Sequence, residues 1–163
     1  MRQNTDFVNT PSRIFICILS LALLFSTGHA QESFEAIKAK AEKGDVVAQY
    51  KLADFYREGK VVKKDEAESY KWRHKAAEQG DVSAQHAVAR ALLEGHGVKK
   101  DGAEAAKWFR KVADQSYYKI SKVIAQGELA ELYEQGNGVP KDEAEALKWY
   151  RRAAESGIDA HAK

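Results

Sequence analysis

Two side chains that could perform nucleophilic chemistry, Ser116 and Lys119, stand three positions apart in the segment SYYK. A serine activated by a lysine amine is the pair used by one class of acyl-transferring enzymes. The motifs S-D-N and K-T-G, which complete such a site, are absent from the sequence. Because a four-residue pattern with two free positions often arises by chance, we assign no catalytic residue and predict that the chain is not an enzyme.

Metal and cofactor chemistry is not indicated by the histidines. A helical metal site needs ligands three or four positions apart, and no histidine after residue 30 has a second histidine or a cysteine at that spacing. The only cysteine, Cys17, lies in an apolar segment near the N-terminus. We therefore predict no metal and no cofactor. We interpret four histidines as surface or groove residues: His74, His86, His96 and His161.

The segment GHGVKK, which begins at Gly95, could cradle a phosphate before a helix. Related segments occur twice more, as GKVVKK from Gly59 and GNGVPK from Gly136. Gly59 and Gly95 are 36 residues apart, Gly95 and Gly136 are 41 apart, and the tryptophans downstream keep the same two spacings. A phosphate loop is needed once, whereas a turn between stacked hairpins is needed in every unit. The three segments therefore predict the turns of an internal repeat.

Each repeat unit is expected to contain two helices. The first ends at one of the repeated glycines, where a left-handed cap has no Cβ clash. The second begins at an aspartate followed three residues later by a glutamate, the capping-box pattern in which each side chain satisfies a backbone amide of the other residue. We therefore interpret the acidic pairs as helix starts and not as a general acid and base. The pairs are Asp65 with Glu68, Asp101 with Glu104, and Asp142 with Glu145.

Each second helix carries a tryptophan (Trp72, Trp108 or Trp149) and, one turn later, a pair of small apolar residues. Small residues let helices approach closely, and we expect the tryptophan to fill the space beside them. Truncating a tryptophan should cost about 3–5 kcal/mol. A single hairpin cannot bury its apolar face alone, so neighbouring units must stack. The predicted fold is all-α: an α-solenoid of three helix-turn-helix repeats with an N-terminal capping helix in SFEAIKAKAEKGD.

The first thirty residues differ in composition from the rest. The apolar run IFICILSLALLF follows Arg2 and Arg13 and precedes Gly28 and Ala30, the small residues of a signal-peptidase site. The run is shorter than the roughly 20 apolar residues that span a bilayer. We expect a secretory signal over 1–30 that is cleaved after Ala30, a periplasmic or secreted product, and no stable membrane anchor. The repeat domain would cover 31–163, with units at about 45–80, 81–121 and 122–157.

The recurring pattern AxxGxxxAxxxLAxxYxxGxGVxxDxxxAxxWYxxAA resembles the Sel-one-like repeat, a relative of the tetratricopeptide repeat. The resemblance covers about residues 41–163, and LAELYEQGNGVPKDEAEALKWYRRAAESG in the third unit is its best match. Two positions depart from the pattern: Val61 replaces the second glycine of the first turn, and Arg73 stands where an aromatic residue is expected. The resemblance implies an adaptor or scaffold that binds another protein or peptide on its concave surface, in cell-envelope or host-contact processes.

The helix register predicts which residues line that concave surface. The groove would run from mixed polar and aromatic to acidic, which suits a basic or mixed-charge peptide; a solvated helix face is the alternative for each residue. With a formal net charge of +2 and no basic block, nucleic acid is not an expected partner. The predicted residues are Tyr50, Asp54, Arg57, His86, Arg90, Leu93, Glu128, Glu131 and Glu134.

The third unit is five residues longer than the second before its first helix. Tyr117, Ile120 and Ile124 follow one another at helical spacing, so we expect this helix to start early. Either the extension packs on the preceding hairpin, or Tyr117 and Tyr118 form a protruding aromatic edge for a partner.

Two further expectations concern association and an alternative function. The last unit ends without a following repeat to cover it, which favours self-association through the terminal helices or a docked partner. The alternative function is a penicillin-interacting or β-lactamase-like hydrolase that uses Ser116 and Lys119.

Overall fold

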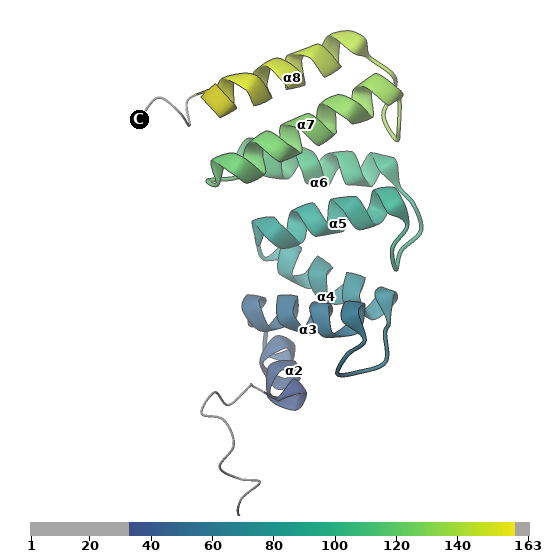
Figure 1. Cartoon of the computed structure of the whole chain (residues 1–163), viewed down its shortest axis with the longest axis vertical. Coiled ribbons are helices and arrows are strands. Elements are labelled where there is room, and N and C mark those ends of the chain that lie inside the picture. Colours follow the sequence, from purple (N-terminus) through teal and green to yellow (C-terminus); the bar gives the residue numbers. More distant parts are fainter. Residues whose placement is uncertain (1–32, 159–163) are drawn as a thin grey trace, which may run out of the picture. The chain divides into compact units, whose positions relative to one another are not determined.

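The computed structural model describes residues 33–158, which are helical apart from turns (Figure 1). No strand occurs in that range. The expected signal over 1–30, with Cys17 and the cleavage position after Ala30, lies outside the described residues, as does His161. The helices are α2 (Phe34–Glu42), α3 (Val46–Glu58), α4 (Glu66–Glu78), α5 (Val82–Glu94), α6 (Gly102–Gln115), α7 (Lys119–Gln135) and α8 (Glu143–Ile158).

Three helical hairpins follow one another: α3 with α4, α5 with α6, and α7 with α8 (Figure 1). Each helix packs against the next one in the chain, and α2 packs against α3. This arrangement confirms the predicted all-α solenoid of three helix-turn-helix units with an N-terminal capping helix. Between residues 33 and 158, no helix combines the length and apolar character needed to cross a membrane.

Local sequence determines where the first helices begin and end. The side chains of Asp45 and Asp81 accept hydrogen bonds from backbone N–H groups three residues later, at 2.7 and 2.6 Å, as N-cap residues do. At the other ends, Gly59, Gly95 and Gly136 adopt φ values of 68, 80 and 70°. The predicted left-handed glycine caps are therefore confirmed.

The second helices begin where predicted, but the capping box is only half formed. Asp65, Asp101 and Asp142 each accept a hydrogen bond from the N–H of the glutamate three residues later, at 2.9 Å. The predicted return bond is wrong, because each aspartate N–H donates instead to a carbonyl of the preceding helix at 2.8 or 2.9 Å. The turn brings that carbonyl onto the amide, so the glutamates pair with lysines, as Glu104 does with Lys107.

Replacing Asp101 with alanine should lower the free energy of unfolding by about 1 kcal/mol, because the N–H of Glu104 loses its acceptor. The matched control is Glu104→Gln, which should cost much less because that carboxylate contributes only an exposed ion pair with Lys107. Urea unfolding measures both. Equal losses would indicate a reciprocal capping box.

The core residues recur with the period of the repeat, but the three tryptophans are not equally buried. Trp72 and Trp149 are buried, at 8% and 4% exposed. Trp108 is only half-buried, so the prediction of three core tryptophans is correct for two. In the second hairpin the fully buried aromatic residue is Phe109. Because Phe109 fills the interior, the Trp108 indole lies partly open to solvent against the His74 ring, with 5.5 Å between ring centroids.

Buried glutamines connect each of the first two hairpins to the helix before it. Gln49 and Gln85 are 3% and 4% exposed. Their side-chain amides donate to the carbonyl oxygens of Ala41 and Ala77, both at 3.2 Å. The repeated Ala-Gln pair therefore gives a second hydrogen bond to a helix-end carbonyl that already accepts one from the backbone N–H of Gly44 or Gly80 at 3.0 Å.

The turn of each later hairpin lies against the start of the previous hairpin's second helix. A Cβ on Gly97 would lie 2.0 Å from the carbonyl oxygen of Glu66, and a Cβ on Gly138 would lie 2.0 Å from the carbonyl carbon of Gly102. Val61 holds the equivalent place in the first turn and is 53% exposed. The position equivalent to Glu66 is residue 30, and α2 begins four residues later, so within residues 33–158 no start of a preceding second helix meets this turn.

One face of α8 is uncovered within the described part of the chain. Leu147 and Tyr150 are 49% and 39% exposed, and Ala154 is also exposed. The residues 41 positions earlier in α6 include Ala106 and Phe109, which are 7% and 0% exposed because α7 packs against them. The expected bare face is present, whereas self-association through it stays a prediction.

Candidate functional site

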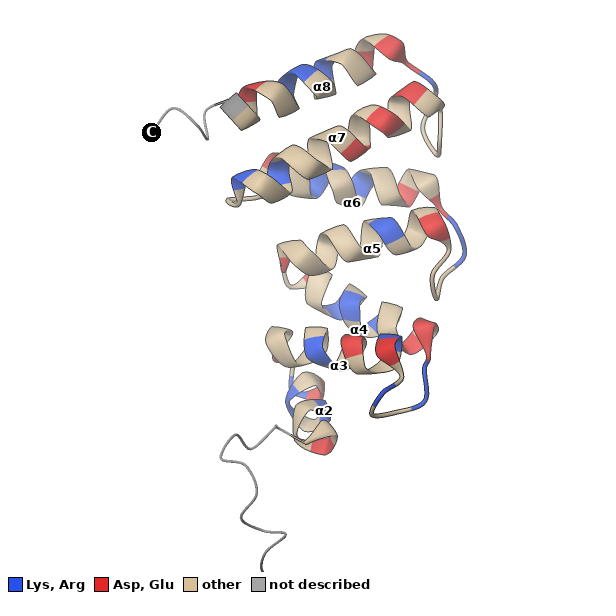
Figure 2. Ribbon diagram, in the orientation of Figure 1, with Lys and Arg blue, Asp and Glu red and all other residues tan. Residues whose placement is uncertain are grey.

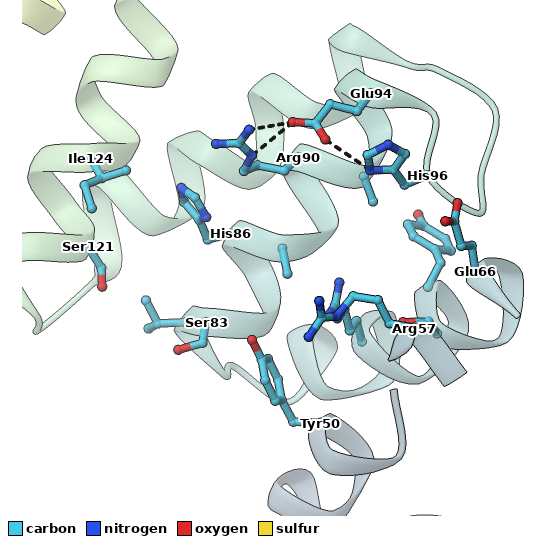
Figure 3. Close-up of a pocket in the computed structure, with 16 residues that line it drawn as sticks. Tyr50, Arg57, Glu66, Ser83, His86, Arg90, Glu94, His96, Ser121 and Ile124 are labelled. Atoms are coloured by element: carbon cyan, nitrogen blue, oxygen red, sulfur yellow. Dashed lines mark hydrogen bonds and ion pairs between the residues drawn. The ribbon is translucent and has the colours of Figure 1, made fainter. Parts of the chain in front are cut away.

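A groove of about 450 Å³ runs along α3, α5 and the first turns of α7, and we call it the inner groove. Figure 3 shows His86 and Arg90 on α5, with Ser121 and Ile124 of α7 to one side and Tyr50 of α3 to the other. Helix α4 and the turn after α5 complete the lining. Its lining includes the side chains of Tyr50, Arg57, Ser69, Arg73, His86, Arg90 and Ile124.

Five of the nine residues predicted for the concave surface meet at this groove. Tyr50, Arg57, His86 and Arg90 line it. Asp54 adjoins them, because its carboxylate accepts hydrogen bonds from Arg57 at 3.2 Å. All five lie on α3 and α5, so the first two hairpins provide the central part of the predicted surface. Their role in binding stays a prediction.

Three predicted residues form an acidic extension of the groove along α7 (Figure 2). The Glu128 carboxylate lies 3.6 Å from the Arg90 guanidinium. Burial raises the pKa of Glu128, while Arg90 acts in the opposite direction. Glu131 and Glu134 are exposed, and Glu134 accepts a hydrogen bond from the Tyr150 hydroxyl at 2.9 Å. The acidic end of the predicted surface therefore lies on α7, and its role in binding stays a prediction.

The remaining predicted residue, Leu93, is half-buried and packs against the core, and it is not among the residues that line the inner groove, so its role stays a prediction. Covering the core is favourable for an apolar side chain. The groove also takes Ser69, Tyr70 and Arg73 from α4, which sequence reasoning missed. Arg73 carried a signal, because it departs from the repeat where an aromatic residue is expected. A charged side chain at a core position must reach polar surroundings.

The arginine side chains of the groove are paired with carboxylates. Asp54 is shared by Arg57 and Arg73, at 3.2 and 3.0 Å. On α5, Arg90 pairs with Glu94 at 2.6 Å, and Figure 3 shows this pair. Arg57 also pairs with Glu58 at 3.3 Å, so the two guanidinium groups on α3 and α4 have two carboxylate partners, of which Arg73 contacts only the shared Asp54.

The imidazole of His86, in the inner groove, has a lowered pKa. Burial lowers the pKa of His86 below its ordinary value of 6.5, and Arg90 adds to this shift. The imidazole packs edge-on against Phe109, with 5.4 Å between the ring centroids. Its Nε2 atom is buried and has no hydrogen-bond partner among residues 33–158. The folded chain therefore favours the neutral imidazole.

This lowered pKa predicts a pH-dependent stability. Above pH 6.5 His86 is neutral in both states, whereas below it the unfolded chain binds a proton that the folded chain resists. The control His86→Tyr carries the residue of the equivalent position, Tyr50. The melting temperature of the wild type should therefore fall relative to that of His86→Tyr when the pH is lowered from 7.5 to 5.5. Thermal unfolding at the two pH values measures it. An unchanged difference would contradict a buried neutral His86.

The first helix of the third unit starts early, as predicted: α7 has 17 residues, whereas α3 and α5 have 13. The alternative that the extension packs on the preceding hairpin is wrong, because Tyr117, Tyr118 and Ile120 are 99%, 69% and 77% exposed. The extra residues lengthen α7 alone, so the preceding hairpin has no matching turn to cover them. Ile124 connects this apolar edge to the inner groove. Its use by a partner stays a prediction.

The Ser116 hydroxyl is engaged in a local turn. Its Oγ accepts a hydrogen bond from the N–H of Tyr118 at 3.1 Å and donates to the Tyr118 carbonyl oxygen at 3.2 Å. A serine that closes a turn after a helix has a structural role, so this geometry favours a turn residue over a nucleophile. Over the described range, no three His, Cys, Asp or Glu side chains are grouped to hold a metal ion.

Two solved structures resemble the chain along most of its length. One is a protective antigen present in uropathogenic Escherichia coli strains that displays an SLR fold; it is 38% identical with a TM-score of 0.67, and the match covers 78% of this chain and 26% of that one. The other is a Sel1 repeat protein from Oxalobacter formigenes; it is 36% identical with a TM-score of 0.65, and the match covers 76% of this chain and 49% of that one. The chain thus spans about a quarter and about half of these two proteins.

Sequence comparison identifies the repeats themselves. No curated protein matches the chain. The Sel1 repeat pattern matches three segments, 46–81, 82–117 and 123–158; the first two each contain one hairpin of the structure, and the third contains the last hairpin except for the first four residues of α7. Sel1 repeats generally mediate protein–protein interactions. The chain belongs to the Sel1 repeat family.

Proposed function

We propose that the chain is an exported scaffold that binds another protein or a peptide in the inner groove. The observation that carries this proposal is the groove itself, which brings Tyr50, His86 and Ile124 of three successive hairpins to one surface. Arginine and tyrosine side chains are enriched at protein interfaces, and both line this groove. The exposed Tyr117 and Tyr118 would extend the contact beyond the groove.

Export is the second part of the proposal. It rests on the apolar run over 14–25 and the small residues Gly28 and Ala30 that follow it. The similar E. coli protein is described as a protective antigen, which supports a role in the cell envelope or in host contact for this chain. Sequencing the N-terminus of protein recovered from periplasm and medium should give Gln31 as the first residue. An intact Met1 in the cytosol would contradict export.

Site-specific photocrosslinking tests the binding surface. A photoreactive amino acid at Ser83 or Ala87, which line the inner groove, should give an adduct of the same mass from both positions. The matched controls are Lys107 and Lys148, exposed on α6 and α8 outside the groove. They should give no such adduct in the native envelope. Adducts only from the control positions, or equally from all four, would overturn the groove as the binding site.

A further inference from the structure

Three residues that line the inner groove each carry a buried polar atom with no hydrogen-bond partner among the described residues: Ser69 Oγ, Arg73 Nε and His86 Nε2. Ser69 is only 4% exposed. Buried polar groups in folded proteins almost always have a partner, and an unpaired one destabilises the fold. Three such atoms from two helices lining one groove suggest that a bound group pairs with them.

The repeat provides an internal comparison for these positions. One period after Ser69 and Arg73 stand Ala105 and Phe109, which are both 0% exposed. The same hairpin position therefore accepts an apolar pair that leaves no polar atom unpaired. Ser69 and Arg73 are thus not required by the helical hairpin as such, and a binding role explains why the polar pair is present.

The unpaired atoms specify the chemistry of their partner. Arginine Nε–H can only donate a hydrogen bond, and a serine hydroxyl and a neutral histidine can each donate one. Arg73 is held in place by Asp54 at 3.0 Å and by the Tyr50 ring, whose centroid lies 5.9 Å from the guanidinium carbon. Arg73 shares its partner Asp54 with Arg57, so its guanidinium group can bind a further carboxylate through the unpaired Nε–H. A group with several acceptor positions and a negative charge fits, and a carboxylate has both.

We infer that Ser69, Arg73 and His86 form a subsite for an aspartate or glutamate side chain of the bound partner. The inference rests on the proposed function and narrows it, because it requires the bound segment to carry an acidic residue at the α4–α5 junction. The glutamates along α7 lie further along the same surface and would face basic residues of that segment. The partner is therefore a mixed-charge segment with its acidic residue toward α4.

Peptide selection tests the subsite. A phage-displayed library of random dodecapeptides is selected on the purified protein, and the binders are synthesised with amidated C-termini, together with analogues in which each Glu or Asp becomes Gln or Asn. Fluorescence anisotropy should show that one such change weakens binding about tenfold or more. The variant Ser69→Ala with Arg73→Phe, which carries the residues of the second repeat, should fold and bind acid and amide peptides alike.

The control Lys71→Gln removes a positive charge from an exposed position on α4 and should keep the preference for acid over amide. Binders whose affinity does not depend on any carboxylate would overturn the subsite and leave the proposed function standing. A carboxylate preference that survives in the double variant would also overturn it. Failure to select any binder, together with failure of the groove crosslinks, would overturn both proposals.

Discussion

Replacing Phe109 with alanine should lower the free energy of unfolding by about 3–5 kcal/mol, because a fully buried ring is removed from the main core. The ring also packs against His86, with 5.4 Å between centroids, so the loss should reach across the α5–α6 hairpin. Trp108→Ala should cost less although its side chain is larger, since the indole is only half-buried. Chemical denaturation of both variants gives the comparison.

The matched control for Phe109 is Tyr150→Ala at the equivalent place in the third hairpin. Tyr150 is 39% exposed and donates one hydrogen bond, to Glu134. Its removal should therefore cost far less than the removal of Phe109. If both substitutions lowered the free energy of unfolding equally, the result would contradict a stack in which neighbouring helices cover the second hairpin on both sides and the third hairpin on one side.

Gly97→Ala should destabilise the protein by about 2–4 kcal/mol. Its φ of 71° disfavours a side chain, and the added Cβ would lie 2.0 Å from the carbonyl oxygen and 2.3 Å from the carbonyl carbon of Glu66. The turn of the second hairpin would have to move away from the start of α4, which opens the junction beside the inner groove. Gly97→Ala should therefore lower both the melting temperature, measured by thermal unfolding, and the affinity for the partner.

Two other glycines separate the causes of that loss. Gly44 has a φ of 94° but no atom within 4 Å of an added Cβ, so Gly44→Ala should cost only the backbone term of about 1–2 kcal/mol. Gly127 lies within α7 and also has no atom within 4 Å of an added Cβ. Gly127→Ala should stabilise the helix by about 0.5–1 kcal/mol. A cost at Gly97 no larger than that at Gly44 would show that the turn does not pack tightly against Glu66.

The parts of the fold that sequence could predict are those determined by local chemistry. Helix ends at Gly59, Gly95 and Gly136 follow from the positive φ that glycine alone adopts freely. The N-cap role of Asp65 and Asp101 follows from a hydrogen bond that spans three residues. Because these signals recur with the period of the repeat, they also predicted the number of hairpins.

The features that sequence could not predict depend on neighbours distant in the chain. The aspartate amides expected to bind glutamate side chains bind carbonyls of the preceding helix, since the turn folds back on it. Trp108 and Phe109 are adjacent, and only the packing of α5 and α7 around α6 decides which of them fills the core. Val61 departs from the repeat, yet it lies at a turn that meets no start of an earlier second helix among the residues that the structure describes.

The candidate site was predictable to a similar extent. Helix register gave Tyr50, His86 and Arg90, because all three face the same side of the first helices. It could not give Ser69 or Arg73, which line the groove from the second helix α4, where Arg73 bonds Asp54 of α3. A departure from the repeat proved a better guide to this part of the groove than the repeat itself.

Amide hydrogen exchange of the complex formed with the crosslinked partner tests most directly whether the inner groove is the binding surface. Exchange should slow in α3, in α5 and in the first turns of α7 relative to the free protein, with α6 and α8 unchanged. Slowing confined to α6 and α8 would contradict the account.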